Sequence, residues 1–405
     1  MKILLSAYAC EPHKGSEPAV GWNWMLSLVK QGHEVTVLTR ENNRSALEAQ
    51  IAQRSLPVKP VYFDLPAWCG RWKRWPGGLN AYYFLWQIGA YRLARKLHRL
   101  TPFDLVHHIT FVTFRQPSFM GGLGIPFILG PVGGGETSPR HLRGGMSLSG
   151  RFRESFRDLI IAFAKHDPLM NRTFSKASLI GCTTAETLQR IPGRFHHKCL
   201  VLPAIGIDPP ADQHPPIVPS SPSFLFIGRL LYWKGLHLVL RAMPEVLRQL
   251  PDARLKIVGE GKDAPWLKQV AESAGIAAHI DWIPRLPHQE ISTAYRGHVA
   301  FVFPSLHDSG GLVILESLAA QLPVICLALG GPGLFVNPSC GIVIDPYQSE
   351  ELIQKSIADA MISLAQQPST REALAANCFA RARQFTWSDA AHRLYSAFNS
   401  SRSSH

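Results

Sequence analysis

Patterns typical of metal sites and disulfide frameworks are missing from this sequence. Its seven cysteines are odd in number, lie far apart and form no Cys-x-x-Cys pair. Neither a zinc site nor a set of disulfides is therefore expected. Scattered cysteines of this kind are typical of a reduced cytosolic protein, and we expect no bound metal and no cofactor.

Long apolar segments are also missing. Residues 3–9 are apolar, but Glu11 and His13 follow at once, which favours a first buried strand over a signal peptide. The longest uncharged stretch, residues 116–135, is interrupted repeatedly by proline and glycine, so a membrane-spanning helix is not expected there. The absence of such a helix does not exclude contact with a membrane surface.

Acidic residues are few. The chain of 405 residues has 42 Lys and Arg but only 29 Asp and Glu, which gives a net charge of +13. This balance indicates an anionic partner, which could be a nucleic acid, a phosphorylated substrate or an acidic membrane. The hydrophobic share of 46% excludes a disordered chain, and the length suits two domains.

Short β-rich runs alternate with helical patterns in two series, which predicts an α/β fold with parallel sheets. The expected strands are 2–7, 34–38, 104–109, 126–129, 223–227, 254–258, 300–303 and 323–326, and the expected helices include 20–30, 235–250, 312–322 and 350–364. We predict a first domain at 1–202, a proline-rich linker at 203–222, a second domain at 223–384 and a C-terminal segment at 385–405. That segment is expected to form a helix that packs back on the first domain and to end in a disordered tail at 400–405.

Two cations lie in the string GRLLYWKG, residues 228–235, where an expected strand meets an expected helix. Arg229 and Lys234 could converge on one anion, and the glycines let the backbone approach it. The alternative is two solvated surface cations.

The string HDSGGLVILE, residues 307–316, follows another expected strand. Gly310 and Gly311 precede an apolar helix, whose free N–H groups form an anion site. Asp308 and Glu316 supply carboxylates, which accept hydrogen bonds from sugar or ribose hydroxyls. The alternative is an N-cap at Asp308 or Ser309 with an exposed helical Glu316.

Together, the two strings resemble the retaining family 4 glycosyltransferases, which belong to glycosyltransferase group 1 and have the GT-B fold. The loop at 13–17, the string IVGEG at 257–261 and FTWS at 385–388 also resemble that family. The resemblance implies two Rossmann-like parallel-sheet domains that face each other across a cleft. The N-terminal domain would bind the acceptor, and the C-terminal domain would bind a nucleotide-diphosphate sugar.

The resemblance also implies residue roles. Arg229 and Lys234 would neutralise the departing diphosphate, so that no metal is required. Asp308 would contact the transferred sugar, although the family usually has Glu there. Glu316 would bind the ribose. The donor-binding set would be Gly15, Gly228, Arg229, Lys234, Gly310, Gly311 and Glu316.

Two features of the first half could lie on the acceptor side. The family often has a histidine after the corresponding strand, and His108 is favoured over His107 as a catalytic residue near the transferred sugar. A structural histidine remains the alternative for either one. Gly133 and Gly134 could approach the acceptor or form a flexible loop.

Basic and aromatic residues interleave over 68–99 without any acidic residue. This mixture suits an anionic membrane surface, single-stranded nucleic acid, or an amphipathic helix with core aromatics and a solvated basic face. The membrane is favoured, with contact through Arg71, Trp72, Lys73, Arg74 and Trp75.

The favoured function is a retaining glycosyltransferase that moves a hexose to a saccharide or lipid-linked saccharide acceptor. Family habit suggests bacterial exopolysaccharide, capsule or lipopolysaccharide biosynthesis at the inner face of the plasma membrane, without a nucleic-acid partner. A nucleotide-sugar 2-epimerase and a basic nucleic-acid-binding protein are the alternatives.

Overall fold

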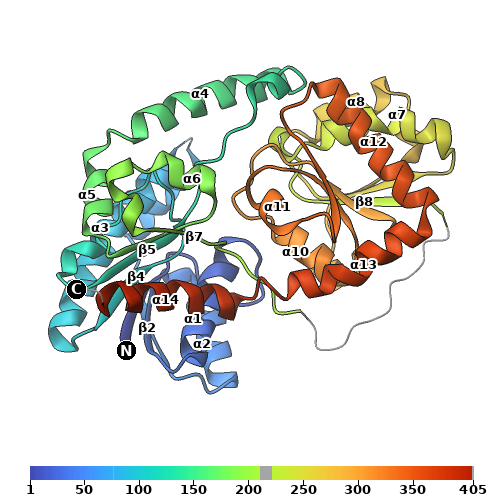
Figure 1. Ribbon diagram of the computed structural model, residues 1–405. Helices are drawn as coiled ribbons and strands as arrows, with labels where there is room; N and C mark the ends of the chain where they lie inside the picture. The colour runs from blue at the N-terminus through green and yellow to red at the C-terminus, as the bar shows by residue number, and fades with distance from the viewer. Residues whose placement is uncertain (76, 210–220, 404–405) are drawn as a thin grey trace. The chain divides into compact units, whose positions relative to one another are not determined.

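The computed structural model describes residues 1–75, 77–209 and 221–403. It divides into two units, each with its own sheet (Figure 1). Unit 1 comprises Met1–Gly135, Ile160–Ile205 and Trp387–His405, and unit 2 comprises Glu136–Leu159 and Gly206–Thr386. None of the described helices is both long enough and apolar enough to cross a membrane.

Unit 1 contains a parallel sheet of seven strands in the order β3-β2-β1-β4-β5-β6-β7. The strands are β1 Lys2–Ser6, β2 Glu34–Thr39, β3 Val58–Tyr62, β4 Leu105–His108, β5 Phe127–Val132, β6 Leu179–Cys182 and β7 Cys199–Val201. The helices are α1 Glu17–Lys30, α2 Arg44–Gln53, α3 Gly78–Leu100, α5 Pro168–Lys176, α6 Ala185–Arg190 and α14 Trp387–Ser403. Figure 1 shows α14 beside α1, against which it packs.

Unit 2 contains a parallel sheet of six strands in the order β10-β9-β8-β11-β12-β13. The strands are β8 Ser223–Ile227, β9 Arg254–Val258, β10 Ile280–Ile283, β11 Ala300–Phe303, β12 Val324–Leu327 and β13 Gly341–Ile344. The helices are α7 Leu236–Gln249, α8 Ala264–Ser273, α9 His288–Ala294, α10 Leu312–Ala319, α11 Gly330–Phe335, α12 Glu350–Gln366 and α13 Pro368–Ala382. The boundary between the units falls inside a further helix, α4 Leu148–Ala164.

The central strands of unit 2 are almost continuously apolar because helices cover both faces of the sheet. All four residues of β11, AFVF, are buried, as are four of the five residues of β8, SFLFI. In unit 2, α7 packs against α12 through its apolar face. Both sheets have the strand order of a Rossmann-like fold, with the chain reversing direction across the sheet beside the first strand.

The predicted strands 223–227, 254–258 and 300–303 have the bounds that the structure shows. Two other expectations are wrong. Residues 136–159 cluster with unit 2, although the sequence placed them in a first domain of 1–202. Residues 400–403 are helical within α14 instead of disordered. Of the expected linker, residues 203–209 form no helix or strand, and 210–220 lie outside the described residues, as do 404–405 of the expected tail.

Candidate functional site

The two motif strings lie at the switch point of the unit 2 sheet. The loop 228–235 follows β8, and the loop 304–311 follows β11. Strand β8 lies between β9 and β11 in the sheet, so the two loops start from neighbouring strands. Ligands of open parallel sheets bind at the carboxyl ends of the strands, where the strand order reverses. The two loops therefore frame the expected ligand position in this unit.

An ion pair joins the two strings. The ammonium group of Lys234 donates to Oδ2 of Asp308, and each side chain is only 16% exposed. Half-burial holds the pair in one geometry and strengthens its electrostatic interaction relative to a surface pair. The structure thus brings the side chains of Lys234 and Asp308 together.

Asp308 is fixed by backbone contacts as well. Its Oδ1 accepts from the Gly310 amide at 3.3 Å, and its carbonyl accepts from the Gly331 amide at 2.7 Å. Helix α10 has Gly311 at its N-cap position without any side-chain cap, so the alternative of an N-cap at Asp308 or Ser309 is wrong. The first amides of α10 are left for an anion.

The glycines around the site allow loops to pack closely on one another. A Cβ on Gly235, which has a φ of +73°, would lie 1.8 Å from the Pro304 carbonyl oxygen. A Cβ on Gly331 would lie 1.8 Å from the Gly310 carbonyl oxygen. Gly228 would make only ordinary contacts. Close approach at Gly235 is therefore to a neighbouring loop, which differs from the ligand approach that the sequence suggested.

Glu316 lies in α10 and is half-buried. Its Oε2 accepts from the hydroxyl of Tyr295 at 2.8 Å. Burial, together with the charge of Glu316, raises the pKa of Tyr295 well above its ordinary value, so the tyrosine remains a donor. The alternative of an exposed Glu316 is wrong, because the carboxylate is oriented by a buried partner.

Arg229 is exposed at the start of the first loop. No hydrogen bond or ion pair of its side chain is found within the described part of the chain. Its guanidinium group can therefore meet an incoming anion without first breaking a contact, whereas Lys234 must exchange its carboxylate partner.

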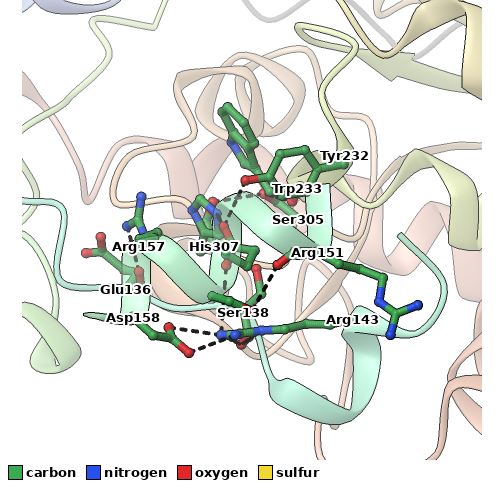
Figure 2. Close-up of polar contacts among 12 residues, drawn as sticks. Glu136, Ser138, Arg143, Arg151, Arg157, Asp158, Tyr232, Trp233, Ser305 and His307 are labelled. Carbon is green, nitrogen blue, oxygen red and sulfur yellow. Dashed lines mark hydrogen bonds and ion pairs between the residues drawn. The ribbon is translucent and has the colours of Figure 1, made fainter. Parts of the chain in front are cut away.

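Tyr232 of the first loop and His307 of the second loop, labelled in Figure 2, both contact a buried carboxylate that sequence reasoning missed. Oε1 of Glu154, in α4, accepts from the Tyr232 hydroxyl at 3.0 Å and pairs with Nε2 of His307 at 3.1 Å. The His307 ring stacks on Trp233. Burial acts to raise the pKa of Glu154, but the hydrogen bond and charge of His307, with hydrogen bonds from Ser138 and Tyr232, outweigh it and lower this pKa to about 2. No sequence signal separates Glu154 from an ordinary solvated helical glutamate.

The two histidines of β4 do not offer a ring nitrogen to a ligand. His107 pairs through Nδ1 with the Tyr395 hydroxyl at 3.0 Å and through Nε2 with the Gly130 carbonyl at 2.7 Å. His108 contacts the Tyr83 hydroxyl at 2.9 Å and the Ser118 hydroxyl at 3.2 Å. Both rings are buried. These contacts favour the structural alternative, and His108 leaves the proposed catalytic set.

The three candidate glycines of unit 1, Gly15, Gly133 and Gly134, differ in burial and conformation. Gly133 is buried and extends the sheet through an isolated bridge to Thr113, so its role here is structural. Gly134 is half-buried with a φ of +88°, a conformation that favours glycine. Gly15 is exposed before α1, with open space around it. These residues belong to unit 1, whereas the Lys234 and Asp308 pair belongs to unit 2.

The segment expected to contact a membrane is only partly exposed. Residues 67–74 form a short 3-10 helix, on which Arg71 and Arg74 are exposed and are followed by Trp75. Trp72 instead packs against the core, and the Lys73 ammonium lies 3.8 Å from the centre of the Tyr82 ring. These contacts favour a packing role for Trp72 and Lys73 over contact with a membrane.

The rest of the basic and aromatic stretch forms α3. Its aromatic residues Tyr82, Tyr83 and Trp86 are buried in the core, and its basic residues Arg92, Arg95, Lys96 and Arg99 are exposed. This is the amphipathic-helix alternative, and it holds for α3.

Buried histidines predict acid sensitivity. Burial lowers the pKa of His107 to about 4 and that of His237 to about 3. These histidines take up protons near pH 6.5 in the unfolded chain but not in the folded chain. The free energy of unfolding is therefore highest above pH 6.5 and decreases as the pH is lowered below 6.5. Below pH 6.5, each such histidine should lower the free energy of unfolding by about 1.4 kcal/mol per pH unit. Calorimetry should show a lower Tm at pH 5 than at pH 7.5, and a Tm that is unchanged would contradict the burial of these rings.

Part of this chain is similar in sequence to known proteins. Residues 210–380 match the family described as glycosyl transferases group 1. The D-inositol 3-phosphate glycosyltransferase of Rhodococcus jostii is 30% identical over 188 residues, which cover 44% of this chain and 40% of that protein. The match thus spans well under half of this relative.

Two solved structures are similar over the full length. Sucrose-phosphate synthase from Thermosynechococcus elongatus has a TM-score of 0.64 at 15% identity and covers 100% of both chains. HepE from Anabaena, in complex with UDP and glucose, has a TM-score of 0.62 at 16% identity and covers 99% of this chain and 100% of that one. The chain has the two-sheet GT-B fold. Residues 210–380, most of the second unit, match the glycosyl transferases group 1 family, in agreement with the resemblance.

Proposed function

We propose that this protein is a retaining glycosyltransferase that moves a hexose from a nucleotide-diphosphate sugar to a saccharide or lipid-linked saccharide acceptor. The observation that carries the proposal is the Lys234–Asp308 pair at the switch point of a group 1 domain. Glu316 and exposed Arg229 lie on the same two loop-and-helix segments. The UDP bound in the HepE structure supports a nucleotide diphosphate as the leaving group.

The proposed reaction needs no dedicated protein base. The bond between the sugar C1 and the phosphate oxygen breaks, and a bond from C1 to the acceptor oxygen forms on the same face. The acceptor hydroxyl proton passes to the departing phosphate. Negative charge grows on that diphosphate, and Arg229, Lys234 and the first amides of α10 stabilise it without requiring a metal. Asp308 then meets the transferred sugar once Lys234 has turned to the diphosphate.

The proposed setting is bacterial exopolysaccharide, capsule or lipopolysaccharide biosynthesis, with the protein in the cytoplasm at the inner face of the plasma membrane. Arg71, Arg74 and Trp75 are the exposed residues of the expected membrane segment. Cations attract anionic headgroups, and tryptophan settles at the boundary between water and lipid. We retain these three residues as the proposed contact.

Nucleoside diphosphates should stabilise the protein. UDP, GDP, ADP and TDP are compared at equal concentration by thermal shift, without added metal. A diphosphate at a hundred times its Kd should add about 2.7 kcal/mol, which raises the Tm by a few degrees. Glu316→Gln keeps an acceptor for Tyr295 but loses the charge, so calorimetric titration should show affinity about tenfold weaker. Glu272→Gln, an exposed position in α8, is the matched control.

Three results would contradict the proposed function. A panel in which no diphosphate shifts the Tm would remove the donor site. Product analysis separates the chemistry, because an epimer of the donor sugar formed without any acceptor product would show a 2-epimerase. Tight, salt-sensitive binding to oligonucleotides would instead indicate a nucleic-acid-binding protein.

A further inference from the structure

Helix α4, Leu148–Ala164, has its apolar side turned outward. Leu148 is 80% exposed, Phe152 76% and Phe163 67%. At about 100° per residue, the exposed apolar residues form one stripe about 120° wide. The members of this stripe, called the α4 stripe below, are Leu148, Phe152, Phe156, Leu159, Ile160 and Phe163.

The inner side of α4 carries two carboxylates with protein partners, Glu154 and Asp158. Glu154 is fully buried against Tyr232 and His307. The Asp158 carboxylate accepts from Arg143 at 2.7 Å and 3.0 Å. These contacts fix which side of residues 148–159 faces the rest of unit 2, and Figure 2 shows the pair of Arg143 and Asp158. Rotation of the helix to bury the stripe would strand the Glu154 charge, so the outward orientation is held in place.

The charges around the stripe are positive. Arg151 and Arg153 are exposed and lie on its two sides, and Lys165 is exposed just beyond its end. The only acidic residues of α4 are Glu154 and Asp158, and both are engaged on the inner side. An apolar stripe between cations complements an anionic lipid surface, where arginine heads meet phosphate and rings enter the acyl boundary.

We infer that α4 docks this protein on an anionic lipid surface, lying in the plane of the membrane with the α4 stripe inserted. This surface is separate from Arg71, Arg74 and Trp75. It goes beyond the proposed glycosyl transfer, because it needs no donor chemistry.

The test compares two double variants of the full chain. Wild type and variants are sedimented with vesicles of phosphatidylcholine alone, and with vesicles of phosphatidylcholine and phosphatidylglycerol in equal amounts. Phe152→Ser/Phe156→Ser should weaken partition into the anionic vesicles by about tenfold or more. Tyr347→Ser/Leu352→Ser removes two exposed apolar side chains of unit 2 outside α4 and should bind as wild type does.

Other results would overturn the inference. Equal sedimentation of the α4 variant and wild type would do so, as would wild type that ignores anionic vesicles. Concentration-dependent dimers that the α4 substitutions abolish, without vesicle binding, would show that a second copy covers the stripe. Loss of binding in Arg71→Ser/Arg74→Ser alone would assign the membrane to the other surface. Diphosphate thermal shifts measured on the same variants report folding and the donor site independently.

Discussion

Lys234→Ala should lower kcat by about 100- to 1,000-fold, the loss seen when one fixed donor to a developing negative charge is removed. The proposed leaving group gains charge as the glycosidic bond breaks, and the Lys234 ammonium lies beside Asp308 where that charge would form. Because the effect is specific to the transition state, KM for the donor should change much less. Initial rates measured with saturating acceptor give both constants.

The control for this substitution is Lys268→Ala, an exposed lysine of α8 in the same unit. It removes the same charge from the surface and should leave kcat unchanged. The thermal unfolding of both variants is compared, since Lys234→Ala also leaves Asp308 without its cation. A kcat near that of wild type would remove Lys234 from the diphosphate site and reduce it to a structural partner of Asp308.

Gly235→Ala should destabilise unit 2 by about 2–5 kcal/mol. A left-handed φ costs a residue with a Cβ about 1–2 kcal/mol, and forcing an added methyl group into a packed position costs about 1–3 kcal/mol more. Here that methyl group would meet the Pro304 carbonyl oxygen at 1.8 Å. Calorimetry should show a Tm lower by about 10 °C.

Gly275→Ala is the matched control for Gly235→Ala. Its φ is +70°, close to that of Gly235, but nothing lies within 4 Å of an added Cβ. It should therefore report the cost of the backbone conformation alone, about 3 °C in Tm. Equal losses in the two variants would mean that the loops 228–235 and 304–311 yield to the methyl group instead of locking against each other.

The sequence predicted the strands of unit 2 well because parallel strands covered on both sides are continuous apolar runs. It also placed Lys234 and Asp308 in loops that follow two strands of the second series, and the structure joins their side chains. The local sequence pattern was a weaker guide to the roles of the two histidines in β4. There the histidines' tertiary partners, Tyr395 for His107 and Tyr83 for His108, lie far away in the chain.

Long-range contacts account for what was missed. In the sequence, Glu154 is one of several charged residues in a helix. Only the folded structure places it in hydrogen-bond contact with Tyr232 and His307. The same limit applies to Trp72, which looks like a surface anchor beside basic residues but packs against the core. Burial of a side chain depends on what the rest of the chain places over it, and periodicity alone does not contain that information.

The Glu154 contacts bear on how this protein could be recombined with its relatives. Residues 136–159 are encoded within the first half of the chain, yet they belong to unit 2 and supply the acceptor for Tyr232 and His307. In a chimaera joined at the linker, residues 136–159 would come from one parent protein and the loops that they contact would come from the other. An exchange of unit 2 between relatives therefore needs two additional crossover points, one on each side of residues 136–159, so that these residues stay with the loops they support.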